Sequence, residues 1–270
     1  MNIHPTAVID PGARLGKNVT VGPCAVIEAE VDIGDGCTIG PHATILRHTA
    51  LGEGCRVHAG AVLGDWPQDL SFKGETTYVR IGKGVTLREF VTVHRGTKAG
   101  TATEVGDNCF LMANAHIGHN CQVGPGVIIA NGALLGGHVE VGERAFLSGH
   151  VVVHQFVRIG RLAMVGGAAG LGKDVPPFCM VGGMERNRVA GMNIIGMRRA
   201  GLTPDQRKAV KAAFGSLFLS GLNVSQAVEQ IKSEAAPGSA AAEFAAFIEQ
   251  SKRGICRYGA SSSGAASDED

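Results

Sequence analysis

The sequence contains few aromatic residues and no long hydrophobic run. Phenylalanine, tyrosine and tryptophan together account for 5% of the 270 residues, which argues against a wide core filled by large rings. The apolar stretches are short and interrupted by glycine, so none could cross a membrane as a helix, and we expect no stable membrane insertion. A regular repeat begins at Ile3, which leaves no room for a signal peptide.

Charge and cysteine spacing exclude further classes of protein. The formal net charge is +1, so neither nucleic acid nor an anionic membrane is an expected partner. The seven cysteines show neither CxxC pairs nor the even spacing of a disulfide framework. We therefore expect reduced cysteines and a cytoplasmic location.

Glycine is abundant, with 40 residues, and apolar residues recur with a period of six. That period belongs neither to a helix nor to an ordinary strand, and it indicates a structural repeat. Branched apolar residues occupy 26 hexads in three runs, from Ile3 to Leu63, from Ile81 to Val93 and from Val105 to Leu171. The residue four positions later is small, as expected for the wall of a narrow core, and this slot includes Cys37, Cys55, Cys109 and Cys121.

The register is interrupted over residues 64–79 and 94–104 and recovers intact after each interruption. We expect both segments to loop outward, where functional residues concentrate. One hexad cannot bury its apolar residue alone, so neighbouring hexads must stack. The pattern resembles the hexapeptide-repeat proteins, which implies a left-handed parallel β-helix with three hexads per coil, commonly assembled side by side as a homotrimer. We expect this β-helix over residues 1–185, with the repeat ending at Val175-Pro176-Pro177.

The composition changes after the repeat, and the predicted fold is a β solenoid followed by a small helical domain. Residues 186–258 begin with a basic, irregular connector, and Thr203-Pro204-Asp205-Gln206 is typical of a capped helix start. Two more amphipathic helices are predicted over 223–234 and 240–252. Residues 259–270 end in Asp-Glu-Asp, and we expect this acidic tail to be disordered.

Stacking three hexads per coil places residues eighteen positions apart one above another. One corner then carries, over three successive coils, His119, His138, His154 and Gln155, with a hollow left by Gly136 and Gly137. His119 and His138 should lie one coil apart, within about 5–7 Å.

Such a corner suits two chemistries, which the spacing alone does not separate. A neutral imidazole could act as general base on a hydroxyl or amine, with a backbone N–H, most naturally that of Gly137, facing the oxyanion. Alternatively, three imidazoles could bind zinc, as in the carbonic anhydrases built on this same helix.

Motifs outside the hexad positions are more specific. They are Gln68-Asp69-Leu70, His94-Arg95-Gly96-Thr97, Asn114-Ala115-His116-Ile117-Gly118-His119-Asn120-Cys121, Gly137-His138, Val153-His154-Gln155-Phe156, Asp174-Val175-Pro176-Pro177 and Asn193-Ile194-Ile195-Gly196-Met197-Arg198-Arg199. In this order they resemble the acyl-carrier-protein-dependent UDP-N-acetylglucosamine O-acyltransferases, which open lipid A synthesis. The resemblance runs from the first hexad to the C-terminal helices.

The resemblance implies transfer of a 3-hydroxyacyl group from acyl carrier protein to the 3-hydroxyl of UDP-N-acetylglucosamine, without a metal or other cofactor. His119 would be the general base, and the N–H of Gly137 would face the oxyanion. The implied substrate-binding residues are Gln68, Asp69, His116, His138, His154, Gln155, Gly167, Asn193 and Arg199. Of these, Gly167 would leave the acyl groove open, Asn193 would bind the nucleotide, and Arg199 would bind its phosphate. The basic connector would suit an acidic carrier protein.

Three positions depart from the family pattern. Asn120 stands where Asp often follows the catalytic histidine, Ser71 replaces a lysine, and Ala200 replaces a second arginine. An amide orients an imidazole but stabilises its cation less than a carboxylate does. The acceptor therefore stays open between UDP-N-acetylglucosamine and its 3-amino analogue, and a zinc carbonic anhydrase stays open as the alternative from another class.

Overall fold

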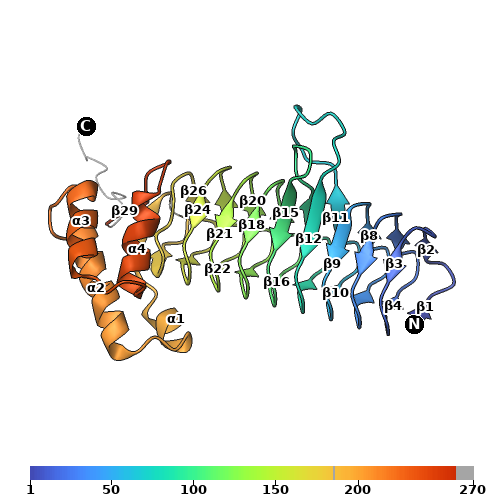
Figure 1. Cartoon of the computed structure of the whole chain (residues 1–270), viewed down its shortest axis with the longest axis horizontal. Helices are drawn as coiled ribbons and strands as arrows, with labels where there is room; N and C mark the ends of the chain where they lie inside the picture. The colour runs from blue at the N-terminus through green and yellow to red at the C-terminus, as the bar shows by residue number, and fades with distance from the viewer. Residues whose placement is uncertain (185, 260–270) are drawn as a thin grey trace, which may run out of the picture.

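The structure is a computed structural model that describes residues 1–184 and 186–259. The chain forms an elongated left-handed parallel β-helix with a group of helices at its C-terminal end, and the N-terminus lies at the opposite end (Figure 1). Among the described residues, no helix has both the length and the apolar composition needed to cross a bilayer. The predicted tail falls, apart from Gly259, outside the residues that the structure describes.

Every strand that the structure describes lies in one of three sheets, which we name A, B and C. Sheet A contains β1 (Asn2–Ile3), β4 (Thr20–Val21), β7 (Thr38–Ile39), β10 (Arg56–Val57), β13 (Thr86–Leu87), β16 (Phe110–Leu111), β19 (Ile128–Ile129), β22 (Phe146–Leu147), β25 (Met164–Val165), β27 (Cys179–Val181), β28 (Arg188–Met192) and β29 (Arg257–Tyr258). Sheet B contains β2 (Val8–Ile9), β5 (Val26–Ile27), β8 (Thr44–Ile45), β11 (Val62–Asp65), β14 (Thr92–His94), β17 (His116–Ile117), β20 (Leu134–Leu135), β23 (Val152–Val153) and β26 (Gly170–Leu171). Sheet C contains β3 (Arg14–Leu15), β6 (Asp32–Ile33), β9 (Thr49–Leu51), β12 (Tyr78–Ile81), β15 (Ala102–Val105), β18 (Gln122–Val123), β21 (Glu140–Val141) and β24 (Arg158–Ile159).

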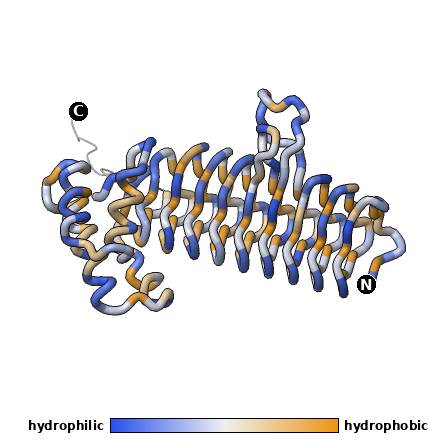
Figure 2. The backbone as a smooth tube through the Cα atoms, viewed as in Figure 1, coloured by the Kyte–Doolittle hydropathy of each residue, from blue (hydrophilic) through white to orange (hydrophobic). Residues whose placement is uncertain are grey.

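The hexad explains why each strand is so short. Its branched residue points inward and is buried, its outward neighbour faces solvent, and a corner follows at once, so hydrophobic and hydrophilic residues alternate along every coil (Figure 2). Ile117 pairs with Leu135 in the next coil, eighteen residues on, which confirms the predicted stacking. The inward residues that lack measurable exposure include Ile45, Leu63, Leu87, Leu111, Ile117, Ile129, Leu135 and Leu147. They form one continuous column along the axis.

Many corners contain a residue in the left-handed region of φ and ψ. At the corner between sheets B and C, φ is +60° at Asn120, +59° at His138 and +65° at Phe156. Asparagine and histidine are among the non-glycine residues most often found there. This conformation turns the chain into the next strand after a single hexad.

Two loops leave the solenoid at this same corner. Residues 66–77 connect β11 to β12 and residues 95–101 connect β14 to β15, and both project from one edge of the prism (Figure 1). The strands extend into the segments expected to loop outward, because Asp65 pairs with His94 and Tyr78 pairs with Ala102. The loops are therefore shorter than the breaks in the sequence register.

The period of six ends at Val175-Pro176-Pro177, but the stacking of coils continues beyond it. Val175 is buried and bridges Ile159, and β27 continues sheet A because Val165 pairs with Val181. This last coil is two residues shorter than a coil without an inserted loop, which breaks the period of six. The two prolines occupy a corner, where their missing N–H groups cost no ladder hydrogen bond.

The connector after the repeat is also more regular than predicted. The structure has β28 antiparallel to β27, followed by α1 (Ile194–Arg199), α2 (Pro204–Phe218), α3 (Val224–Glu234) and α4 (Ala240–Glu249). The capping box predicted at Thr203 and Gln206 is present at the start of α2. Helix α4 lies against the solenoid, where Arg161 donates hydrogen bonds to Glu243 (2.7 and 3.0 Å) and Arg158 covers the ring of Phe247.

We expect Leu111→Ala to lower the free energy of unfolding by about 2–5 kcal/mol, because it opens a cavity in the inward column. Leu219→Ala is the matched control, since Leu219 is 65% exposed whereas Leu111 has no exposed surface. Denaturant unfolding followed by circular dichroism measures both. Equal losses in the two variants would contradict a core built on this column.

Candidate active site

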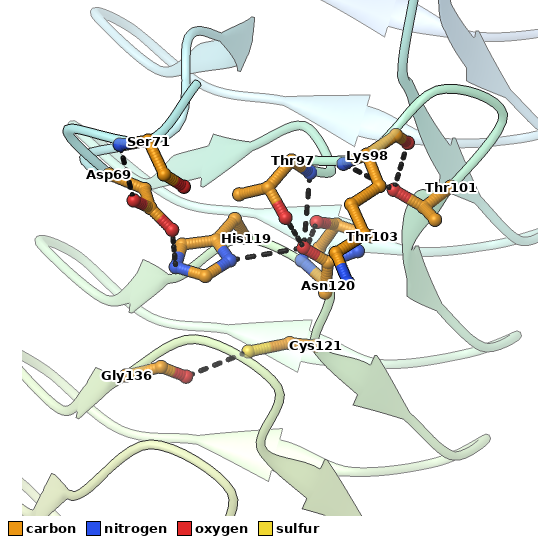
Figure 3. Close-up of polar contacts among 10 residues, drawn as sticks. All are labelled: Asp69, Ser71, Thr97, Lys98, Thr101, Thr103, His119, Asn120, Cys121 and Gly136. Atoms are coloured by element: carbon orange, nitrogen blue, oxygen red, sulfur yellow. Dashed lines mark hydrogen bonds and ion pairs between the residues drawn. The ribbon is translucent and has the colours of Figure 1, made fainter.

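The corner between sheets B and C gathers most of the predicted site residues. His119 follows β17, Gly137 and His138 follow β20, and His154 and Gln155 follow β23, so they lie on successive coils. The ring centroids of His119 and His138 are 5.2 Å apart, within the predicted range. The 66–77 loop adds Asp69, and the 95–101 loop adds Thr97 (Figure 3).

His119 is held at one ring nitrogen and faces a carboxylate with the other. Its Nδ1 lies 3.0 Å from Oδ1 of Asn120, and its Nε2 lies 3.9 Å from Oδ2 of Asp69. The side chain is 13% exposed, so most of the ring is covered by protein. The N–H of Ser71 donates to Asp69 (2.8 Å) and holds the pKa of that carboxyl below its usual value, so Asp69 is ionised at neutral pH.

Gly137 lies directly beneath this ring. A Cβ at position 137 would come within 2.3 Å of both Cε1 and Nε2 of His119, so only glycine leaves room for the imidazole. Among the residues described, none accepts a hydrogen bond from the N–H of Gly137. The preceding carbonyl, that of Gly136, accepts the thiol hydrogen of Cys121 at 3.2 Å, which orients the peptide (Figure 3).

The neighbouring imidazoles are disfavoured as cations. Burial lowers the pKa of His116 to about 4 and also lowers the pKa of His94. Burial lowers the pKa of His138 too, and the positive charges of His119 and Lys98 add to the effect. The ring of His138 stacks on Phe156 with centroids 4.7 Å apart. His94, His116 and His138 are therefore disfavoured as cations, and the carboxylate of Asp69 lies at the edge of the site.

A pocket of about 420 Å³ opens beside His119. Its polar wall contains Gln68, His94, His116, His119, His154 and Gln155, and its apolar wall contains Leu134, Leu135, Val152 and Val153. Leu134 and Val152 are outward residues of sheet B and are 42% and 52% exposed. Such a pocket suits a ligand with a polar head and an apolar chain.

Three predicted site residues lie elsewhere on the prism. Gly167 is at the corner between sheets A and B, beside Gly149. Asn193 caps α1 and donates to the carbonyl of Leu162, at the corner between sheets C and A. Arg199 ends α1, and its carbonyl accepts a hydrogen bond from Arg144 at that same corner. One copy of the chain therefore does not bring these three residues to His119.

Sequence reasoning missed four residues of the site. His94 is 7% exposed with an unpartnered Nδ1, and its ring meets His116 edge-on at 4.9 Å. Thr97 contacts Asn120, and Leu134 and Val152 form the apolar wall. His94 and Thr97 belong to a motif that the repeat does not explain. Leu134 and Val152 are apolar residues at outward positions. Both signals were present in the sequence.

The structure does not favour the zinc alternative. Within residues 1–184 and 186–259, no group of three or more His, Cys, Asp or Glu side chains is arranged to hold a metal ion. Of the three imidazoles that the sequence placed together, those of His119 and His138 meet edge to face, and Nδ1 of His154 lies 3.0 Å from the carbonyl oxygen of Gln155.

Comparison with known families agrees with the fold. A family described as bacterial transferase hexapeptide matches residues 30–65 and 102–137. A second family, described as UDP N-acetylglucosamine O-acyltransferase domain 2, matches residues 174–256. The chain is thus a hexapeptide-repeat acyltransferase.

Relatives of known name narrow this class. The acyl-[acyl-carrier-protein]–UDP-N-acetylglucosamine O-acyltransferase of Anaeromyxobacter sp. (strain Fw109-5) is 44% identical over 95% of this chain and 100% of the relative. The enzyme of the same name from Myxococcus xanthus is 47% identical over 94% of this chain and 99% of its own. The chain belongs to the acyl-[acyl-carrier-protein]–UDP-N-acetylglucosamine O-acyltransferase family.

Solved structures are similar over the same length. Francisella novicida UDP-N-acetylglucosamine acyltransferase superposes with a TM-score of 0.90 at 37% identity and covers 94% of each chain. The LpxA protein of Acinetobacter baumannii gives a TM-score of 0.89 at 38% identity, over 94% of this chain and 99% of its own.

We expect Gly137→Ala to reduce the rate of acyl transfer by about 10²-fold or more, because the added methyl displaces the His119 ring. Steady-state kinetics and thermal unfolding, measured together, separate this effect from misfolding. Gly191→Ala is the control, since nothing lies within 4 Å of a Cβ at that position. A wild-type rate in Gly137→Ala would contradict the ring position described above.

Proposed function

We propose that this protein transfers a 3-hydroxyacyl group from acyl carrier protein to the 3-hydroxyl of UDP-N-acetylglucosamine, the reaction that opens lipid A synthesis, with His119 as general base. The observation that carries this proposal is the close approach of the His119 ring to the backbone of Gly137, where a Cβ would come within 2.3 Å of Nε2. A base and an unpaired N–H donor then flank the same small space.

The chemical step uses His119 first as a base and then as an acid, and uses Gly137 as the oxyanion donor. Nε2 of His119 accepts the proton of the acceptor hydroxyl as its oxygen attacks the thioester carbonyl. The N–H of Gly137 donates to the oxyanion of the tetrahedral intermediate. Collapse of the intermediate breaks the carbon–sulfur bond, and the imidazolium returns its proton to the leaving thiolate. No metal or redox group is needed for the balance.

Substrate binding follows from the two walls of the pocket. Leu134 and Val152 offer apolar surface to the acyl chain, whereas Gln68 and Gln155 offer hydrogen bonds to the sugar. His138 lies outside the pocket wall, beside His119, and offers a further hydrogen bond from there. Asp69 is ionised and lies on the Nε2 side of His119, so it accepts a hydrogen bond from a sugar hydroxyl bound there. His116 donates or accepts only as a neutral ring, because its pKa is lowered to about 4.

The parts of the proposed site that bind the nucleotide and the end of the acyl chain require residues from a second copy of the chain. Gly167, Asn193 and Arg199 lie at corners other than that of His119, so they reach the site only from a neighbour in a homotrimer. Asn193 is largely occupied, because its amide caps α1 and donates to Leu162, which leaves its outer edge for a nucleotide. The Arg199 side chain supplies positive charge to the phosphates.

We expect His119→Gln to lower kcat by about 10²- to 10⁴-fold, because it removes the general base. Purified protein is assayed with 3-hydroxyacyl carrier proteins of several lengths and with UDP-N-acetylglucosamine or its 3-amino analogue as acceptor. His4→Gln is the control, since His4 lies on the exposed first coil. Turnover of the amino sugar alone would replace the acceptor named above, and a wild-type rate in His119→Gln would remove the mechanism.

Mixing two inactive variants tests whether the site spans two copies. We expect His119→Gln and Arg199→Ala, denatured and refolded together in equal amounts, to recover about a quarter of the wild-type activity, since one site in four then joins an intact His119 to a neighbour's intact Arg199. Each variant refolded alone is the control. No recovery, with mixed trimers demonstrated by mass spectrometry, would place both residues within one copy.

A further inference from the structure

The contacts of Asn120 identify which of its side-chain atoms faces His119. One atom, Oδ1, lies 3.1 Å from N of Thr97, 2.9 Å from Oγ1 of Thr97 and 3.0 Å from Nδ1 of His119 (Figure 3). A backbone N–H can only donate, so the atom it meets must be the carbonyl oxygen and not the amide nitrogen. The backbone of Thr97 therefore decides the orientation of the Asn120 amide.

That orientation decides where the proton sits on the neutral imidazole. Because the oxygen of Asn120 can only accept, Nδ1 of His119 must donate, and the lone pair of the ring is left on Nε2. Nε2 is the atom that faces Asp69 and overlies Gly137. The opposite amide orientation would present N–H groups to Nδ1, leave the proton on Nε2 and remove the base from the site.

The surroundings fix this arrangement further. Thr97 is 8% exposed and Thr103 has no exposed surface, so water competes poorly for their hydrogen bonds. Oγ1 of Thr103 accepts the backbone N–H of Asn120 at 2.8 Å, where the Asn120 backbone has a φ of +60°. Both the backbone and the side chain of Asn120 are thus held from buried positions.

We propose that Thr97 is a positioning residue, which acts through Asn120 to hold His119 in the Nδ1–H tautomer with its Nε2 lone pair toward the acceptor. Its effect on rate rests on the function proposed above, whereas the tautomer is a property of the resting protein. Asn120 carries no charge, so the Asp69 carboxylate compensates the cation that forms at His119. The other titratable groups facing His119 or the adjacent His138 ring are His94, His116 and Lys98.

Nitrogen-15 NMR of the histidine rings tests the tautomer directly. The His119 signals are assigned by their loss in His119→Gln, and we expect the pattern of an Nδ1–H ring in the wild type. Thr97→Val leaves the backbone N–H as the single donor from residue 97, so we expect part of the signal to change to the Nε2–H pattern. Thr101→Val is the matched control in the same loop, because its hydroxyl donates to the carbonyl of Lys98 (2.6 Å) and not to Asn120.

An Nε2–H pattern in the wild type overturns the proposal whether or not the protein transfers acyl groups. A wild-type pattern in Thr97→Val overturns the role of its hydroxyl. A protein with the Nδ1–H pattern but without acyl transfer retains the tautomer and contradicts the proposed function instead. The two proposals therefore fail separately.

The pH dependence of kcat/KM tests whether the uncharged side chain at position 120 acts on the His119 ring. Asn120→Asp keeps the acceptor and adds a negative charge beside Nδ1, which favours the imidazolium, so we expect the acidic limb to move up by about one pH unit. Asn108→Asp is the matched control, since Asn108 has the same left-handed backbone (φ +56°) at another corner. We expect Thr97→Val to lower kcat by roughly two- to tenfold with little change in KM. An unmoved limb in Asn120→Asp would show that residue 120 does not act on the ring.

Discussion

Each coil of this solenoid is joined to the next by short parallel ladders, such as the pairing of Ile117 with Leu135, and the same ladders align the corners. Burial of the inward column favours stacking, and the ladder hydrogen bonds fix its register to within one residue. A shift of one residue would turn Ile117 outward and would also carry His119 off Gly137. The core and the site therefore depend on a single register. The pairing of the strands is enough to bring the side chains of the corner together.

The rigidity of the site and its polar groups come from different parts of the chain. His119, Gly137 and His138 are corner residues whose backbone is fixed by the coils above and below. Two other groups come from the inserted loops instead: Asp69, which faces Nε2 of His119, and Thr97, which holds the Asn120 side chain that contacts the ring. A solenoid corner presents imidazoles readily but surrounds them with neutral backbone. The loops supply the carboxylate and the hydroxyl that such a corner lacks.

Much of this arrangement follows from the sequence because a period of six has few structural solutions. Stacking at eighteen residues predicted the contact between His119 and His138, and ring centroids 5.2 Å apart confirm it. Where the period fails, as in the shortened coil at Val175, periodicity carries no signal for the strand β27 that completes the stack. Thr97 was missed because the 95–101 loop reaches the corner by tertiary contacts that no repeat encodes, and His94, the last residue of β14, was missed although its motif departs from the repeat. The αL conformation of Asn120 was equally invisible, since the repeat describes spacing and not backbone angles.

The separation of the predicted residues onto three corners constrains any assembly that unites them. The corner of His119 would have to meet a different corner on its neighbour, that of Arg199, so the contact surfaces on the two copies are not the same. Such a heterologous interface cannot be satisfied in a two-fold dimer, because each copy would leave one surface unpaired. It closes only into a ring, and a three-sided prism whose faces turn by about 120° closes most simply with three copies. The three-fold symmetry of the proposed trimer would then follow from the same triangular cross-section that separates Gly167 and Arg199 from His119 in one chain.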